Sequence, residues 1–228
     1  MINNRLFKQI NKNTNTLLKS FTLSAMQGHF IGPKVLINSI PKAGTNLLYE
    51  LVNLHPLMRG RITKTLSLDN GSDTIVSKMA GFKKGQSVPG HIYFDVEVDI
   101  ALAKNQIKHL LIIRDFRDVI LSNINYLANI DINHPHNVAF KNMATMEDKI
   151  IACITGLPVV GMASWPKMIN TYRGWLKSEN TCVVHFEKLV NSDKTIAENE
   201  IEIIFNHLGL SDGIDIRYLR KKCSILKA

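Results

Sequence analysis

The chain has 228 residues, of which 45% are hydrophobic and 21% charged, a length and composition typical of one globular domain with a sizeable core. The net charge of +9 favours a negatively charged ligand, although the dispersed basic residues and an aromatic content of 7% argue against nucleic-acid binding. Three widely spaced cysteines without a CxxC pair argue against disulfides and zinc, and no membrane span or secretory signal is recognisable, so we expect a cytoplasmic protein.

Residues 1–30 are polar and basic, with apolar residues at loosely helical spacing, and predict an N-terminal helical arm. We expect the remaining residues, 31–228, to form a single domain. No repeat, long linker or low-complexity tract divides them.

Residues 35–48 (VLINSIPKAGTNLL) predict a strand, a tight loop and a helix. The strand ends near Pro41, which cannot donate to a central ladder, and Gly44 permits the turn. We expect Thr45 or Asn46 to cap a helix over residues 46–55.

The free N–H groups at the start of that helix, with Lys42 beside them, form an anion site of the kind that phosphate commonly occupies. Lys42 precedes Gly44, whereas in the nucleotide P-loop a Lys and a Ser or Thr directly follow the last glycine. The alternative interpretation is a strand–glycine–helix turn that binds nothing.

The rest of the chain alternates strands with helices. We expect strands over residues 86–98 (broken at His91), 108–114 and 181–186, and helices over residues 99–106, 115–129, 145–154, 164–176 and 192–207, with irregular structure over residues 57–85. This order predicts an α/β fold, a parallel sheet with helices on both faces. Ligands bind beyond the carboxyl ends of such strands, which directs attention to the residues after Ile40, Ile113 and Phe186.

A second motif, RDFRDVILS, follows the strand that ends near Ile113. Arg114 leaves the strand at the ligand edge, and Ser122 lies two turns along the next helix, so a guanidinium and a hydroxyl can converge on one phosphate. The alternative is a structural ion-pair cluster that Arg114 forms with Asp115, Arg117 and Asp118.

The two motifs together, strand-PKAGT-helix and strand-RDFRDVILS-helix, closely resemble the PAPS-dependent sulfotransferases. VVHFEKL at residues 183–189 is similar to the family strand that ends in Tyr-Glu-Asp-Leu, and IEIIFNHLGL at residues 201–210 to the helix that follows it. The resemblance spans about residues 35–210 and implies a single α/β domain of P-loop-like build.

The resemblance implies transfer of a sulfuryl group from PAPS to a hydroxyl or amine of a small-molecule or carbohydrate acceptor, with PAP as product and no metal. It assigns the 5′-phosphosulfate to the PKAGT loop and the 3′-phosphate to the RDFRDVILS motif. It also places an aromatic ring in the third motif, VVHFEKL. The donor-binding residues would be Lys42, Ala43, Gly44, Thr45, Asn46, Leu47, Arg114, Ser122 and Phe186. Lys42 would also stabilise the charge on the bridging oxygen as PAP leaves.

The acceptor hydroxyl needs a base, which the family commonly provides as a histidine after a strand between the two phosphate motifs. His91 stands in that interval, and a histidine can take a proton near neutral pH. His55 is expected to cap a helix and His109 to be structural, while His134 and His136 alone are too few to indicate a metal.

The chain departs from the family pattern at three points. Leu47 stands where many members have an aromatic that stacks on adenine, Phe186 lacks a tyrosine hydroxyl, and residues 220–222 (Arg-Lys-Lys) lack the glycine of the family's C-terminal Arg-Lys-Gly loop. A non-catalytic PAP- or nucleotide-binding protein therefore stays open. An ATP-dependent kinase is opposed by the position of Lys42 and by the lack of a clear strand-end Asp for Mg²⁺. The acceptor and the oligomeric state are not readable from the sequence.

Overall fold

The computed structural model describes residues 31–58, 65–67, 71–212 and 215–226, with side chains as far as residue 222, so the expected arm over residues 1–30 lies outside the described residues. The described strands form one fully parallel sheet in the order β2-β3-β1-β4-β5, which confirms the predicted α/β architecture. These strands are β1 (Lys34–Ser39), β2 (Leu66–Ser67), β3 (Ser87–His91), β4 (Ile107–Ile113) and β5 (Thr181–His185).

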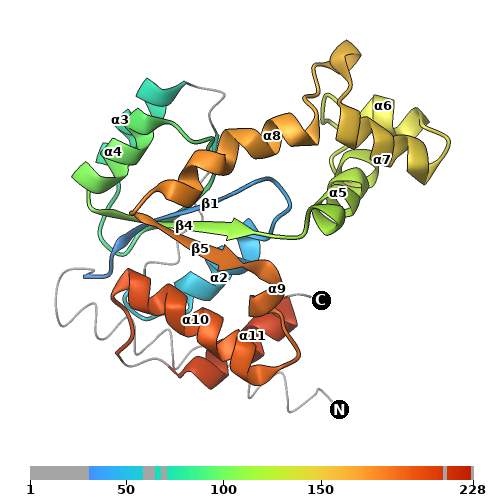
Figure 1. Ribbon diagram of the computed structural model, residues 1–228. Coiled ribbons are helices and arrows are strands. Elements are labelled where there is room, and N and C mark those ends of the chain that lie inside the picture. The colour runs from blue at the N-terminus through green and yellow to red at the C-terminus, as the bar shows by residue number, and fades with distance from the viewer. Residues whose placement is uncertain (1–30, 59–64, 68–70, 213–214, 227–228) are drawn as a thin grey trace, which may run out of the picture.

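Helices cover both faces of the sheet because the central strands are apolar on both sides (Figure 1). In β1, Val35 and Ile37 pack with α2 (Thr45–Asn53), α10 (Lys194–Leu208) and α11 (Ile216–Leu226), while Leu36 packs on the opposite face. That opposite face carries α3 (Ser72–Ala80), α4 (Val96–Lys104) and α8 (Trp165–Tyr172).

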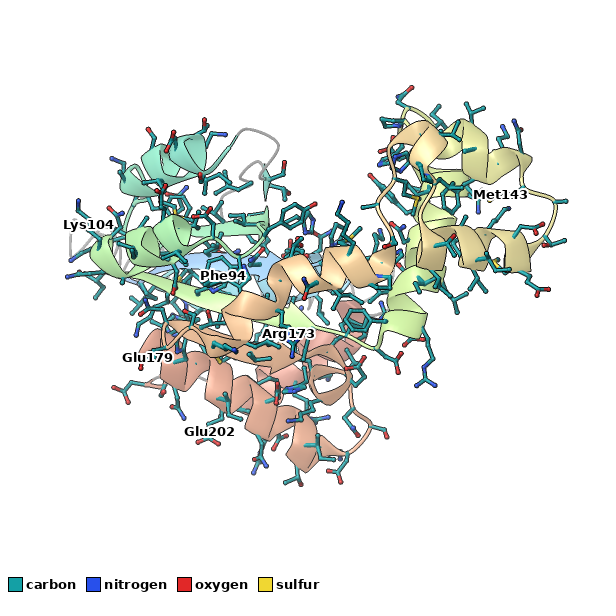
Figure 2. The ribbon with its side chains drawn as sticks, turned by 45° about the horizontal axis from the view of Figure 1, so that its top comes forward. Phe94, Lys104, Met143, Arg173, Glu179 and Glu202 are labelled. Atoms are coloured by element: carbon teal, nitrogen blue, oxygen red, sulfur yellow. The ribbon has the colours of Figure 1, made fainter. Side chains whose placement is uncertain are left out.

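A helical lobe extends from the sheet beyond the carboxyl end of β4 (Figures 1 and 2). It begins with α5 (Phe116–Asn125), which runs directly into a π-helix (Tyr126–Ile130), and continues through α6 (Asn137–Asn142) and α7 (Met146–Thr155). The predicted start and end of α7 are confirmed, because Thr145 and Asp148 form a capping box and Gly156 is the C-cap.

Several predicted helix boundaries are wrong. Helix α2 begins after Gly44, not after a Thr45 or Asn46 side-chain cap, and it ends at Asn53. Helix α4 begins three residues earlier than predicted, because the Asp95 carboxylate accepts from the N–H groups of Glu97 and Val98.

Other differences concern whole elements. Residues 57–85, predicted as irregular, contain β2 and α3, and α6 was not predicted. The predicted helix over residues 115–129 divides into α5 and the π-helix, and the helix over 164–176 divides into α8 and a 3₁₀ segment (Arg173–Lys177). The strand predicted to include Phe186 stops at His185, where the short helix α9 (Phe186–Leu189) begins. Across the described part of the chain, no helix has the length and apolar character needed to cross a membrane.

Candidate active site

The loop between β1 and α2 is shaped by Gly44, which has a φ of 113° and is the N-cap of α2 without a side-chain hydrogen bond. A Cβ at this position would lie 2.6 Å from Cδ2 of Phe186, so only glycine lets that ring rest against the loop. The first N–H groups of α2 have no partner within the helix and carry the positive end of its dipole. The loop therefore has the geometry and the helix-dipole field that favour an anion at the carboxyl edge of the sheet.

Lys42 lies in this loop with a φ of 71°, a left-handed conformation that is uncommon for a residue with a side chain. Its Nζ lies 4.2 Å from the ring centroid of Tyr126, the first residue of the π-helix, and partial burial lowers the pKa of its ammonium. Within the described residues Lys42 forms no ion pair. Its charge is therefore available to an anion bound at the loop.

His91 ends β3, the neighbour of β1, and its Nδ1 lies 2.9 Å from the carbonyl oxygen of Ser39. A carbonyl only accepts, so Nδ1 carries the proton and the neutral ring keeps a lone pair on Nε2. Burial is the main cause that lowers the pKa of His91, the bond to Ser39 opposes it, and the charge of Lys42 adds to the lowering. The ring is thus held neutral, with Nε2 able to accept a proton.

The backbone beside His91 is fixed by two side chains that sequence reasoning missed. The amide of the buried Asn38 donates to the carbonyl of Ile92 and accepts from its N–H, both at 2.8 Å. The indole of Trp175 also donates to that carbonyl, at 2.9 Å. These bonds extend the pairing of β1 and β3 past His91 and so position its ring.

Arg114 follows β4, and its guanidinium carbon lies 4.3 Å from the ring centroid of Phe186. Its Nη2 lies 3.6 Å from Oδ2 of Asp118, while its Nε is buried without a hydrogen-bond partner among the described residues. Ser122 lies one turn beyond Asp118 on α5, so the two share the helix face that Arg114 approaches. Arg114 and Ser122 thus lie on the same side of the motif, as the phosphate hypothesis requires.

The ion-pair alternative for this motif is also formed in part. Arg117 and Asp115 make a forked pair, with Nε to Oδ1 at 3.0 Å, and these hydrogen bonds lower the pKa of the Asp115 carboxyl to about 2. Arg117 is 88% exposed, so this pair lies outside the site. Among the described residues, the long contact with Asp118 is the one ion pair that Arg114 makes.

Two glutamates tie the third motif to the rest of the site, and sequence reasoning assigned a role to neither. Oε1 of Glu187 accepts from the N–H of Asp115 at 2.7 Å, which joins the turn after β5 to the turn after β4. The buried Glu200 accepts from the N–H of His185 at 2.6 Å. Together they hold Phe186 between Gly44 and Arg114. The family motif Tyr-Glu-Asp-Leu has a glutamate at the position of Glu187. This match was the feature of the sequence from which the role of Glu187 could have been predicted.

Some predicted donor-binding side chains face inward. Leu47 is 8% exposed and packs in the core between α2 and the sheet, and the hydroxyl of Thr45 hydrogen-bonds with that of Ser39. These two side chains are therefore turned away from a ligand at the loop, whereas Asn46 is exposed. The ring of Phe186 packs against the loop at Gly44, and this contact could not be predicted from the sequence.

The remaining candidates lie away from this edge. His109 is buried in the first half of β4, its Nδ1 is 2.7 Å from Oγ1 of Thr181, and burial lowers its pKa to about 3. Nδ1 of His55, beyond the far end of α2, accepts from the N–H of Leu57. Among the described residues no group of three or more His, Cys, Asp or Glu side chains is arranged to hold a metal ion. Arg220 donates to Glu198 at 2.9 Å.

Comparison with known proteins adds three findings. A model of the family described as "Sulfotransferase domain" matches residues 32–224. The structure is similar to the crystal structure of the mouse sulfotransferase SULT7A1 complexed with PAP, with a TM-score of 0.56 and 15% sequence identity over 86% of this chain. The match covers 65% of that chain, less than two thirds of its length, and at this identity it shows a shared fold. No curated protein matches the sequence significantly.

Proposed function

The chain belongs to the sulfotransferase family, and from this premise we propose that it transfers a sulfuryl group from PAPS to a hydroxyl or amine of a small-molecule or carbohydrate acceptor. The observation that carries the proposal is the convergence of Lys42, His91 and Arg114 at the carboxyl ends of the adjacent strands β1, β3 and β4. An ammonium in a glycine loop, an imidazole and a guanidinium at one edge of the sheet support transfer of a sulfuryl group from a donor that carries two phosphates.

The residues present fit such a donor. The N–H groups at the start of α2 and the ammonium of Lys42 suit the 5′-phosphosulfate. The guanidinium of Arg114, whose Nε has no hydrogen-bond partner among the described residues, and the hydroxyl of Ser122 suit the 3′-phosphate. The half-buried ring of Phe186, next to Arg114, offers an apolar face to adenine. We propose that the matched segment, extended to residues 31–228, is the catalytic domain; a cytoplasmic location stays a prediction.

The transfer would be an in-line displacement, in which positioning and charge stabilisation lower most of the barrier. The oxygen of the acceptor hydroxyl attacks sulfur, and the bond between sulfur and the bridging oxygen breaks. Nε2 of His91 takes the proton of that hydroxyl as the new bond forms. Lys42 stabilises the negative charge that develops on the bridging oxygen, which leaves with PAP. No step in this scheme requires a metal, because protein donors neutralise the phosphates.

Thermal unfolding with PAP, ADP or ATP–Mg²⁺ tests the donor site. A ligand at about 100 times its dissociation constant should stabilise the protein by roughly 2.7 kcal/mol. We expect a clear shift with PAP, a much smaller one with ADP, and loss of this difference in Arg114→Met but not in the matched surface variant Arg117→Met. Equal shifts with PAP and ADP in the wild type would show that the 3′-phosphate is not recognised.

Binding alone does not distinguish an enzyme from a binding protein. Labelled PAPS offered with a panel of phenols, alcohols, amines and sugars should give a labelled product with at least one class of acceptor. PAP binding without transfer to any acceptor would favour the non-catalytic alternative, and Mg²⁺-dependent ATP turnover would favour the kinase.

A further inference from the structure

A pocket of about 100 Å³ lies between the loop after β1, the end of β4 and the last turn of α8. Apolar side chains form most of its wall, among them Ile40, Ile113 and Ile169. Phe116 and Leu176 also line it and are 40% and 55% exposed, so its mouth opens to solvent through an apolar rim. The pocket therefore accepts an apolar group from outside.

Two polar groups in this wall lack hydrogen bonds. Tyr172 is 4% exposed, packs edge-on against Tyr93, and its buried hydroxyl has no partner among the described residues. The buried Nε of Arg114, which lines the same pocket, is also without one. Because buried donors are nearly always paired in folded proteins, the hydroxyl of Tyr172 points to a ligand with an acceptor oxygen. The Nε of Arg114 can serve either this ligand or the proposed 3′-phosphate.

The charged residues that line the pocket are Arg114 and Arg173. Arg173, labelled in Figure 2 where α8 passes into its 3₁₀ segment, lines the pocket, is exposed, and forms no ion pair with any described residue. None of the described residues that line the pocket is acidic. Two guanidinium groups beside an apolar wall favour an anion over a neutral or cationic molecule.

The pocket is separate from the anion site at the start of α2. Ile40 and Tyr172 pack in the hydrophobic cluster on the sheet face that carries α8, whereas α2 packs on the opposite face. The loop after β1 lies between the two sites, and Ala43 and Arg114 border both. This inference accordingly stands on the pocket itself and not on the proposed function.

We propose that this pocket is a second binding site, for a small organic anion that has a body of about one aromatic ring and a carboxylate, sulfonate or sulfate group. A closed apolar cavity of about 150 Å³ holds benzene, so this pocket of about 100 Å³ holds part of one ring, and the rest of the ring lies in the open mouth beside Phe116 and Leu176. The anionic oxygens would accept from Tyr172 and face Arg173 at the mouth. The ring would fill the space beside Ile40 and Ile169.

The test uses toluene-4-sulfonate, whose sulfur–carbon bond prevents it from acting as a sulfuryl donor, and its neutral analogue toluene-4-sulfonamide. Ligand-observed NMR titration of the full chain should show saturable binding of the sulfonate at millimolar concentration or below. We expect binding to weaken about tenfold in Tyr172→Phe, in Arg173→Gln and on replacing sulfonate by sulfonamide, since bonds to a charged group are lost. Arg217→Gln, an exposed charge on α11, is the matched control and should bind like the wild type.

Tyr172→Phe also has a readout of its own. Its thermal unfolding without ligand should be unchanged or shifted upward, because the variant removes only a buried hydroxyl without a partner. If this variant does not fold, the exposed Arg173→Gln carries the test. Absence of saturable binding, equal binding of the sulfonamide, or binding that survives both pocket substitutions would overturn the proposal.

Discussion

The hydrogen bond between His91 and the carbonyl of Ser39 decides which ring nitrogen can accept a proton. Because Nδ1 is the donor in this bond, a base at this position must act through Nε2. The lowered pKa keeps the ring neutral somewhat below pH 6.5, the ordinary value. A base that is lost on protonation gives a rate that falls as pH falls.

We therefore expect kcat/KM to be nearly constant from pH 8 to 6.5 and to decline only below pH 6.5. His91→Gln should reduce turnover by about 10²- to 10⁴-fold, as expected for loss of a general base, and leave PAP binding nearly unchanged. His134→Gln, a half-buried histidine in the lobe, is the control. A midpoint above pH 6.5, or loss of PAP binding in the variant, would contradict the assigned role.

A second prediction for a single residue concerns Lys42, whose ammonium is proposed to stabilise the charge on the leaving group. Lys42→Met keeps the length of the side chain and removes its charge, and we expect turnover to fall about 10²- to 10³-fold, the usual effect of removing one preorganised donor. Lys78→Met, on the exposed face of α3, should have no effect in the same assay. Normal turnover in the Lys42 variant would place the charge stabilisation elsewhere.

At the scale of elements, the turn from β1 to α2 is constrained by the ring of Phe186, which comes from a distant part of the chain. Gly44 and Gly209 both have positive φ, but only at Gly44 would a Cβ meet another residue, the ring of Phe186. Gly209→Ala should destabilise the protein by about 1 to 2 kcal/mol, the cost of a left-handed alanine. Gly44→Ala should cost more than that and weaken PAP binding, as denaturant unfolding and ligand titration would reveal. Equal stability of the two variants would mean that Phe186 moves aside freely.

The hydrogen bond that the N–H of Asp115 donates to Glu187 gives a further prediction at this scale, because it joins two motifs that lie 72 residues apart. Glu187→Ala should weaken PAP binding several-fold, whereas Glu187→Gln, which keeps an acceptor oxygen, should have a smaller effect. Glu179→Ala, on the surface before β5, is the control. Titration calorimetry of the three variants separates this role from a general loss of stability.

These examples show what the sequence can predict and what it cannot. Strands β1, β4 and β5, the alternation of strands and helices, and the loop around Lys42 follow from apolar runs, Pro41 and Gly44, which are local signals, whereas β2, α3 and α6 were not predicted. The N-cap at Gly44, the π-helix at Tyr126 and the bond from Glu187 depend on contacts between distant segments, for which a single sequence gives no pattern. The roles assigned to His91 and to the donor-binding residues stay predictions.

At the scale of the whole molecule, burial lowers the pKa of several histidines, namely His55, His91, His109, His136 and His207. Below pH 6.5 the unfolded chain binds protons that the folded protein does not, so the free energy of unfolding should fall as pH falls. For His109, with a folded pKa of about 3, the loss between pH 7 and pH 5 is about 2 kcal/mol.

Denaturant unfolding at pH 5, 6 and 7 measures this loss. His109→Gln should lower stability at pH 7 and reduce the further loss at pH 5 by about 2 kcal/mol relative to the wild type. The carboxyl of Asp115 does not contribute in this range, because its lowered pKa affects stability only below about pH 4. A free energy of unfolding that is independent of pH between 7 and 5 would show that the histidines bind protons equally well in the folded and unfolded states, which would contradict the lowered pKa values.

The order of the strands has a consequence for how the protein acquires its site during folding. The loop of Lys42, His91 and Arg114 come from β1, β3 and β4, which pair side by side although long stretches of chain separate them. Loop closure must precede every one of these pairings, and parallel sheets with such distant contacts form slowly. In refolding experiments the return of PAP binding should therefore coincide with the last kinetic phase, after most of the helical signal has recovered.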